Sequence, residues 1–191
     1  MSEEWRTFCA VELHDNVRER LREHIRRLRE AVPEAVASWT RVENIHLTLK
    51  FFGNVDVDRI SVISEAAARA VKEFSPFRIG IAQTGVFPKV LWIGVSDPSG
   101  KLASLQRQLE NECARAGFEK EDRAYRPHLT IARLRKPSRR LVDTHLQMNF
   151  ETVEIEVKEL VVFRSELSSK GSKYTALFRQ DLQILSNDLP R

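Results

Sequence analysis

A short alternating phrase occurs twice in this chain, as His-Leu-Thr-Leu at residues 46–49 and as His-Leu-Thr-Ile at residues 128–131. Both copies favour β-structure, and successive side chains of a strand point to opposite faces. The histidine and the threonine of each copy should therefore share one face, while the apolar residues between and after them point into a core. Two such strands facing each other would bring two imidazoles and two hydroxyls to one place.

These four side chains suit acid–base cleavage of a phosphodiester without a metal. Imidazoles donate and accept protons near neutral pH, and hydroxyls can stabilise an oxyanion. His46 and His128 are therefore the candidate acid and base, with Thr48 and Thr130 as donors to the phosphate oxygens. One copy alone would more often be a half-buried strand with a structural histidine, but two copies in a chain of five histidines favour a catalytic pair. The residues do not show which histidine is the acid.

Further candidates follow from the same two-residue period. Lys50 and Arg126 are expected on the motif faces, where each would either bind phosphate or serve as a charge at the rim. Pro127 favours an extended backbone at Arg126. Phe51 and Trp39 could stack on a base, although a place in the core is the stronger expectation for both.

The phrases around both copies resemble those of a known family. The chain resembles the 2H phosphoesterases, and among them the bacterial and archaeal RNA 2′,3′-cyclic phosphodiesterases, also called 2′-5′ RNA ligases. The resemblance covers nearly the whole chain. It rests on ENIHLTLKFFG at 43–53, YRPHLTIAR at 125–133, WRTFCAV at 5–11, GVFP at 85–88, WIG at 92–94, LVVFRSEL at 160–167 and GSKY at 171–174.

The resemblance implies an α+β fold of two pseudo-symmetric lobes, each an antiparallel sheet backed by helices, with the active-site cleft between them. Residues 1–191 would form a single domain made of two intertwined lobes. It also implies hydrolysis of RNA 2′,3′-cyclic phosphate ends to 2′-phosphates, with His46 as the proton donor and His128 as the proton acceptor.

Periodicity along the chain agrees with an α+β fold in two similar halves, but it does not supply the topology. His24 is expected to be structural, and His145 receives no role. The pattern predicts helices at 15–31, 56–74, 99–116 and 139–147, strands at 5–12, 45–52, 77–85, 90–95, 127–134, 150–164 and 173–183, and a polar loop at 168–172.

Composition sets the remaining expectations. A net charge of +4 suits an anionic partner such as RNA. No apolar run approaches the roughly 18 residues of a membrane helix, and the N-terminus Met-Ser-Glu-Glu does not read as a signal peptide. Cys9 and Cys113 lack metal-ligand spacing and are expected to be buried or inert thiols. We therefore expect a cytoplasmic monomer that needs no metal or other cofactor and no membrane.

Three alternatives remain beside the hydrolase. The first is a 2′-5′ RNA ligase that runs the reverse chemistry in the same site. The second is a non-catalytic RNA- or nucleotide-binding module of the same fold, which would have no need for paired proton carriers. The third is a metallohydrolase, which is disfavoured because no carboxylate or cysteine cluster with ligand spacing accompanies the two histidines.

Overall fold

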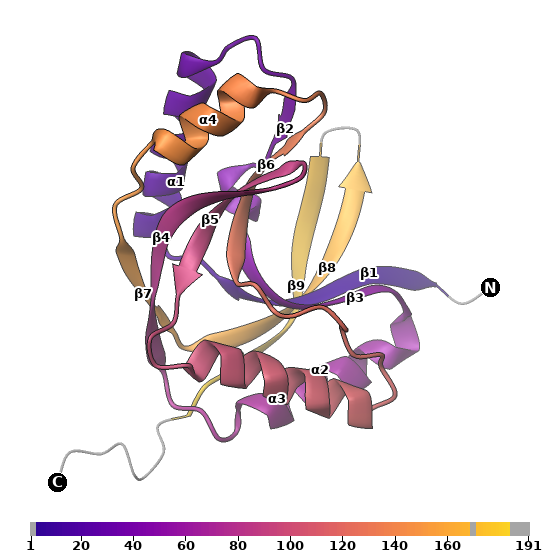
Figure 1. Ribbon diagram of the computed structural model, residues 1–191. Coiled ribbons are helices and arrows are strands. Elements are labelled where there is room, and N and C mark those ends of the chain that lie inside the picture. Colours follow the sequence, from indigo (N-terminus) through magenta and orange to yellow (C-terminus); the bar gives the residue numbers. More distant parts are fainter. Residues whose placement is uncertain (1–2, 169–170, 184–191) are drawn as a thin grey trace, which may run out of the picture.

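The computed structural model describes residues 3–168 and 171–183, which form two antiparallel sheets and four α-helices (Figure 1). Sheet A has the strand order β3-β1-β8-β9, and sheet B has the order β2-β6-β5-β4-β7. The predicted α+β fold with two antiparallel sheets is therefore confirmed. The strands are β1 (Glu4–Glu12), β2 (Ala37–Trp39), β3 (His46–Asp56), β4 (Phe77–Phe87), β5 (Val90–Ser96), β6 (His128–Leu134), β7 (Val153–Val157), β8 (Glu159–Ser168) and β9 (Gly171–Asp181). The helices are α1 (Asp15–Ala31), α2 (Ile60–Val71), α3 (Lys101–Arg115) and α4 (Arg139–Gln147), with short 3₁₀ turns η1 (Val42–Asn44) and η2 (Val57–Arg59).

The helices are divided between the two sheets. Helices α2 and α3 pack on each other and against sheet A, whereas α1 and α4 pack on each other and against sheet B (Figure 1). Helix α1 follows a strand of sheet A yet covers sheet B, and α3 follows a strand of sheet B yet covers sheet A. The chain therefore crosses repeatedly between the two sheets and the helices that cover them. None of the described helices is long and apolar enough to cross a bilayer.

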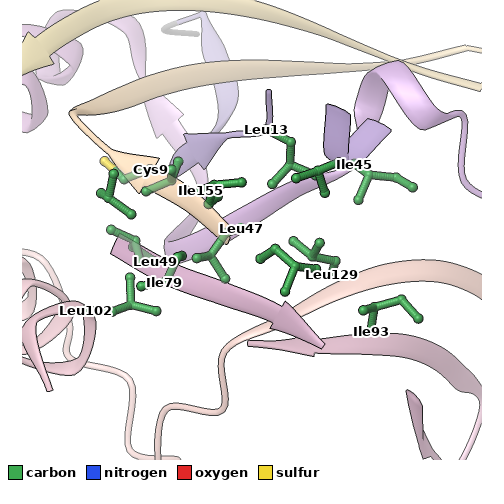
Figure 2. Packing of buried hydrophobic residues seen from close by; sticks show 14 of the residues in the cluster. Cys9, Leu13, Ile45, Leu47, Leu49, Ile79, Ile93, Leu102, Leu129 and Ile155 are labelled. Atoms are coloured by element: carbon green, nitrogen blue, oxygen red, sulfur yellow. The ribbon is translucent and has the colours of Figure 1, made fainter. Parts of the chain in front are cut away.

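The largest hydrophobic cluster takes side chains from both sheets. Leu47 of β3 and Leu129 of β6 are fully buried and belong to this one cluster (Figure 2). Leu49 and Ile131, which end the two motifs, are buried in it as well. The predicted inward direction of the apolar motif residues is confirmed. Truncating any of these side chains to alanine would cost about 2–5 kcal/mol of stability.

The expected strand at 150–164 is instead two strands in different sheets. Strand β7 pairs with β4 in sheet B, whereas β8 pairs with β1 in sheet A. Lys158 lies between them. The apolar pattern runs through this change of sheet, so periodicity alone does not reveal it. The sequence pattern also did not predict the short strand β2. Of the expected polar loop, Ser169 and Lys170 lie outside the described residues, and β9 begins directly after them.

Both cysteines are buried and unpaired, as expected. Burial raises the pKa of the Cys9 thiol well above its usual value, and that of Cys113 to about 12. Neither thiol is therefore ionised near neutral pH.

Candidate active site

The two motif strands lie against each other, and each begins with its histidine. In sheet A, His46 lies opposite Glu12 and Thr48 lies opposite Ala10. In sheet B, His128 lies opposite Gly94 and Thr130 opposite Trp92. Within each strand the histidine and the threonine share one face because they are two residues apart in regular pairing. We call these surfaces the histidine faces of sheets A and B.

Each imidazole is held by a backbone carbonyl two residues earlier in the chain. His46 Nδ1 lies 2.8 Å from the carbonyl oxygen of Asn44, and His128 Nδ1 lies 2.7 Å from that of Arg126. A carbonyl oxygen only accepts, so Nδ1 must carry the proton and donate it. In the neutral ring this leaves Nε2 as the proton acceptor. Both histidines therefore have the same tautomer, and in both the Nε2 atom is the one left to exchange a proton.

Aromatic rings enclose His46. The imidazole stacks on Phe8, with ring centroids 4.5 Å apart, and the ring of Tyr174 meets it edge-on at 5.2 Å. Burial lowers the pKa of His46; the hydrogen bond to the Asn44 carbonyl and the nearby Glu12 carboxylate oppose this. Glu12 itself forms an ion pair with Arg179 at 2.6 Å. The surroundings of His46 thus favour its neutral form.

His128 has different neighbours. Phe87 meets the imidazole edge-on at a centroid distance of 5.0 Å, and Trp92 lies at 6.4 Å. The indole of Trp92 lies over Gly85, where an added Cβ would come within 2.1 Å of the ring. Gly85 is therefore needed for the close approach of Trp92, which in turn packs against Phe87 at 5.3 Å.

The sequence did not identify these four rings as part of the site. Phe8, Phe87, Trp92 and Tyr174 all lie within the phrases that carry the family resemblance, which was the available signal. Their proximity to the histidines depends on the pairing of strands far apart in the chain.

Lys50 does not lie on the histidine face, contrary to the two-residue pattern. Thr48 lies opposite Ala10, and Lys50 lies opposite the next residue of β1, Cys9. Leu49 is therefore an extra residue on β3 and forms a β-bulge. The bulge turns Lys50 to the core face, where its Nζ lies 2.6 Å from the Glu110 carboxylate and 2.8 Å from the Glu119 carbonyl. Both sides of this ion pair are nearly buried, so Lys50 joins β3 to α3 and is not part of the candidate site.

The second motif strand has the same bulge. Opposite Trp92 and Leu91 stand Thr130 and Ala132, which makes Ile131 the extra residue. Beyond each bulge, the next residue returns to the histidine face. It is Phe51 on β3 and Arg133 on β6, opposite Phe8 and Val90 respectively.

The two aromatic residues considered for base stacking, Phe51 and Trp39, differ in their exposure. Phe51 is 50% exposed, so its expected place in the core is wrong. The guanidinium of Arg6 lies 4.5 Å from the centroid of its ring. Trp39 lies opposite Ala132 and packs against the main hydrophobic cluster, as expected.

Arg126 immediately precedes Pro127 and β6. Its backbone carbonyl holds His128, and its side chain is exposed. No carboxylate of residues 3–168 or 171–183 forms an ion pair with its guanidinium. Arg126 therefore remains a candidate for contact with phosphate.

Two other histidines form a buried pair on the far side of sheet B. His24 Nε2 lies 3.1 Å from His145 Nδ1, and His145 Nε2 lies 3.1 Å from the carbonyl oxygens of both Gly85 and Trp92. Burial lowers the pKa of both, that of His24 to about 4. Because both ring nitrogens of His145 are used within the fold, the pair is structural. In the described part of the chain, no group of three or more His, Cys, Asp or Glu side chains is placed to hold a metal ion.

Comparison with known sequences gives a consistent result. The profile of the 2′-5′ RNA ligase superfamily matches residues 11–168. An RNA 2′,3′-cyclic phosphodiesterase of Methanothermobacter thermautotrophicus is 36% identical over 180 residues, which cover 89% of this chain and 95% of that protein. A protein of the same name from Thermotoga maritima is 32% identical over 178 residues, covering 91% and 93% of the two chains.

Solved structures agree with the sequence relatives. The crystal structure of Escherichia coli LigT in apo form superposes with a TM-score of 0.77 at 25% identity, covering 96% of this chain and 100% of that chain. The same protein complexed with 3′-AMP superposes with a TM-score of 0.76 at 25% identity, covering 95% and 100%.

Proposed function

The chain belongs to the 2′-5′ RNA ligase superfamily, as its motifs indicated, and from this premise we propose that it hydrolyses 2′,3′-cyclic phosphate ends of RNA to 2′-phosphates. The observation that carries the proposal is the matched pair of histidines. On neighbouring strands, each imidazole donates from Nδ1 to a carbonyl and leaves Nε2 for proton transfer. The names of the sequence relatives support the same activity.

The proposed reaction places the cyclic phosphate between the two histidine faces. His128 Nε2 takes a proton from a water molecule as the water oxygen bonds to phosphorus. The bond from phosphorus to the ribose 3′ oxygen breaks, and His46 Nε2 gives that oxygen a proton. The product keeps its phosphate on the 2′ oxygen. Each proton transfer by a positioned side chain typically contributes roughly 10²- to 10⁴-fold.

Thr48 and Thr130 would serve the phosphate oxygens that do not take part in bond making or breaking. Their hydroxyls share the faces of the two histidines, and negative charge on these oxygens grows toward the transition state. Hydrogen-bond donors held in advance at such a place stabilise the transition state more than the ground state. Arg126 would add a positive charge beside His128.

The lowered pKa of His46 bears on its role as the acid. Before substrate binds, burial favours the neutral imidazole. The bound cyclic phosphate is a monoanion next to Nε2, and a nearby negative charge raises the pKa of a histidine. His46 would therefore take up its proton together with the substrate.

The direct test uses the purified protein, adenosine 2′,3′-cyclic phosphate and EDTA, with the product isomer identified by phosphorus NMR. We expect full activity in EDTA and adenosine 2′-phosphate as the product. The 3′-phosphate as product would exchange the roles of the two histidines. Complete loss of activity in EDTA, restored by zinc or manganese, would overturn the metal-independent mechanism.

The direction of the reaction needs a second assay. An RNA ending in a cyclic phosphate is mixed with an RNA that has a free 5′ hydroxyl, and the products are separated by length. We expect hydrolysis to dominate, whereas a joined product as the main species would favour the ligase.

We also propose that the protein acts as a monomer in the cytoplasm. Size-exclusion chromatography of the purified protein tests the oligomeric state.

A further inference from the structure

Asn44, two residues before His46, uses three of its polar groups within the fold. Its backbone N–H donates to the Arg41 carbonyl at 2.8 Å, and its own carbonyl accepts from His46 Nδ1 at 2.8 Å. Its side-chain Nδ2 lies 2.6 Å from the carbonyl oxygen of Ser172 on β9. Because a carbonyl oxygen only accepts, the amide nitrogen of the side chain must face Ser172. Asn44 is therefore bonded both to His46 and to a residue 128 positions later in the chain.

Strand β9 reaches His46 in a second way. Tyr174, two residues after Ser172, meets the imidazole edge-on at 5.2 Å. Tyr174 also packs at 5.1 Å against Phe8, the ring on which His46 stacks. Strands β3 and β9 are the two outer strands of sheet A, with β1 and β8 between them. The bond from Asn44 to Ser172 thus connects the entrance of β3 to the opposite edge of the sheet, beside the imidazole.

The His128 half is held differently. His128 Nδ1 donates to the Arg126 carbonyl at 2.7 Å, and the Arg126 side chain is exposed. The next residue is Pro127, which restricts the backbone of the residue before it. The carbonyl that holds His128 is therefore kept in place by a proline, whereas the one that holds His46 belongs to a residue fastened by its own side chain.

We propose that Asn44 is a positioning residue for His46. By fastening the side chain of Asn44 to β9, the fold fixes the carbonyl that keeps the His46 proton on Nδ1 and leaves Nε2 for the leaving oxygen. An imidazole that loses such a partner can carry its proton on either nitrogen. Asn44 does not contact the substrate, so its loss should slow proton transfer and leave binding unchanged. This inference rests on the proposed hydrolysis, in which His46 is the acid.

Two variants remove the link to β9. Asn44→Ala takes away the donor and leaves the backbone carbonyl. Asn44→Asp keeps the shape of the side chain, but an ionised carboxylate only accepts and cannot bond to the Ser172 carbonyl. Asn111→Ala is the matched control, because Asn111 is also half-buried and accepts from Lys120 at 2.7 Å. It lies on α3, which packs against β3 and bonds to Lys50 on the core face.

The first readout separates kcat from KM on adenosine 2′,3′-cyclic phosphate. Both Asn44 variants should lower kcat by about tenfold, since a misplaced catalytic group loses up to roughly 10²-fold in rate. Their KM should stay near that of the wild type. Asn111→Ala should change neither constant.

The second readout is the pH dependence of Asn44→Ala. The hydrogen bond to the Asn44 carbonyl raises the pKa of His46, so a weaker bond should move the fall in kcat/KM to lower pH. None of the ionisable groups beside His46, or paired with those groups, is altered in this variant. They are Glu12 of β1, Glu159 of β8, and Tyr174 and Arg179 of β9.

The third readout uses the other half of the site as an internal control. Nitrogen NMR of the imidazole rings, assigned with His46→Gln and His128→Gln, shows which nitrogen carries the proton. Both rings of the wild type should carry it on Nδ1. Asn44→Ala and Asn44→Asp should give a mixture of tautomers for His46 and leave His128 unchanged.

Other outcomes would overturn the inference. Wild-type kcat in both Asn44 variants, or a His46 tautomer that stays fixed in both, would show that the link to β9 does not position the imidazole. Equal changes at His46 and His128 would indicate a general loosening of the fold, which circular dichroism would also detect. A wild-type protein inactive on the cyclic phosphate would overturn the proposed function, while the NMR comparison would still decide whether Asn44 holds His46.

Discussion

The His46 half and the His128 half of the site have the same backbone but different surroundings. In both, the imidazole donates to the carbonyl two residues earlier, and a bulge follows the threonine. His46 is stacked on Phe8 and its pKa is lowered by burial, whereas His128 meets the edge of Phe87. The comparison teaches that the motif strand determines which chemical groups are present. The strands paired beside it determine how each group behaves.

The residue directly after each bulge also shows that the surrounding elements determine what a strand position can hold. Lys50 and Ala132 occupy equivalent positions on the core face, yet one is a cation and the other a methyl group. The cation is accommodated because α3 supplies Glu110 and the 119–121 segment supplies a carbonyl. Equivalent strand positions therefore carry unlike side chains wherever the covering elements differ.

The largest expected effect is a loss of kcat when the histidine of either half is replaced. His46→Ala and His128→Ala should each lower kcat by roughly 10²- to 10⁴-fold, because each removes one of two proton transfers. The double variant should be little worse than the poorer single variant, since groups that act together are not additive. Rates on adenosine 2′,3′-cyclic phosphate measure this. A well-folded variant with full activity would show that its half does not take part in proton transfer.

The next effect concerns stability and distinguishes Lys50 from Ala132. Lys50→Met should lower the free energy of unfolding by about 3–5 kcal/mol, because the Glu110 carboxylate is left buried without its partner. Urea denaturation measures the loss. The double variant Lys50→Met with Glu110→Gln removes both charges and should recover part of the stability.

This variant also tests where Lys50 lies in relation to the substrate. At a temperature where Lys50→Met is folded, kcat/KM should remain within about threefold of wild type, since the side chain lies on the core face. A selective rise in KM with unchanged stability would return Lys50 to the substrate site.

The threonines test whether both halves contribute donors to the phosphate. Thr48→Ala and Thr130→Ala should each weaken transition-state stabilisation by about 2–4 kcal/mol, as for loss of one oxyanion donor. Thr48→Ser and Thr130→Ser keep the hydroxyl and are the matched controls. Wild-type kcat/KM in both alanine variants would make the threonines purely structural.

The smallest effect sharpens the electrostatic difference between the halves. Burial lowers the pKa of His46 in the free protein. His46 therefore loses its proton at a pH below the usual histidine pKa of about 6.5. As the acid, His46 should make kcat/KM fall as pH rises through that lowered pKa. The fall in kcat should come at higher pH, because bound phosphate raises the pKa.

Glu12→Gln provides the control for this pH dependence. The Glu12 carboxylate raises the pKa of His46, so its removal should move the fall in kcat/KM to lower pH. Arg179 keeps a second carboxylate partner in Glu159 at 2.9 Å. If Glu12→Gln instead moved the rising, acidic limb of kcat/KM, His46 would act as the base.

Much of this protein was determined by its sequence alone. The alternation in the two motif phrases predicted the shared face of His46 with Thr48 and of His128 with Thr130. The helices at α1 to α4 and most strands followed from local periodicity, and the flanking phrases identified the family. These features are readable because the two-residue and 3.6-residue periods depend on the backbone of one segment only.

The tertiary structure decided what depends on a partner strand. The bulges at Leu49 and Ile131 exist only in relation to β1 and β5, so a strict two-residue period misplaced Lys50 and did not predict the exposure of Phe51. The change of sheet at Lys158 and the rings around both histidines have the same origin. Register and bulges are set by hydrogen bonds between segments distant in the chain. Local sequence specifies which residues are available, and strand pairing determines which of them meet.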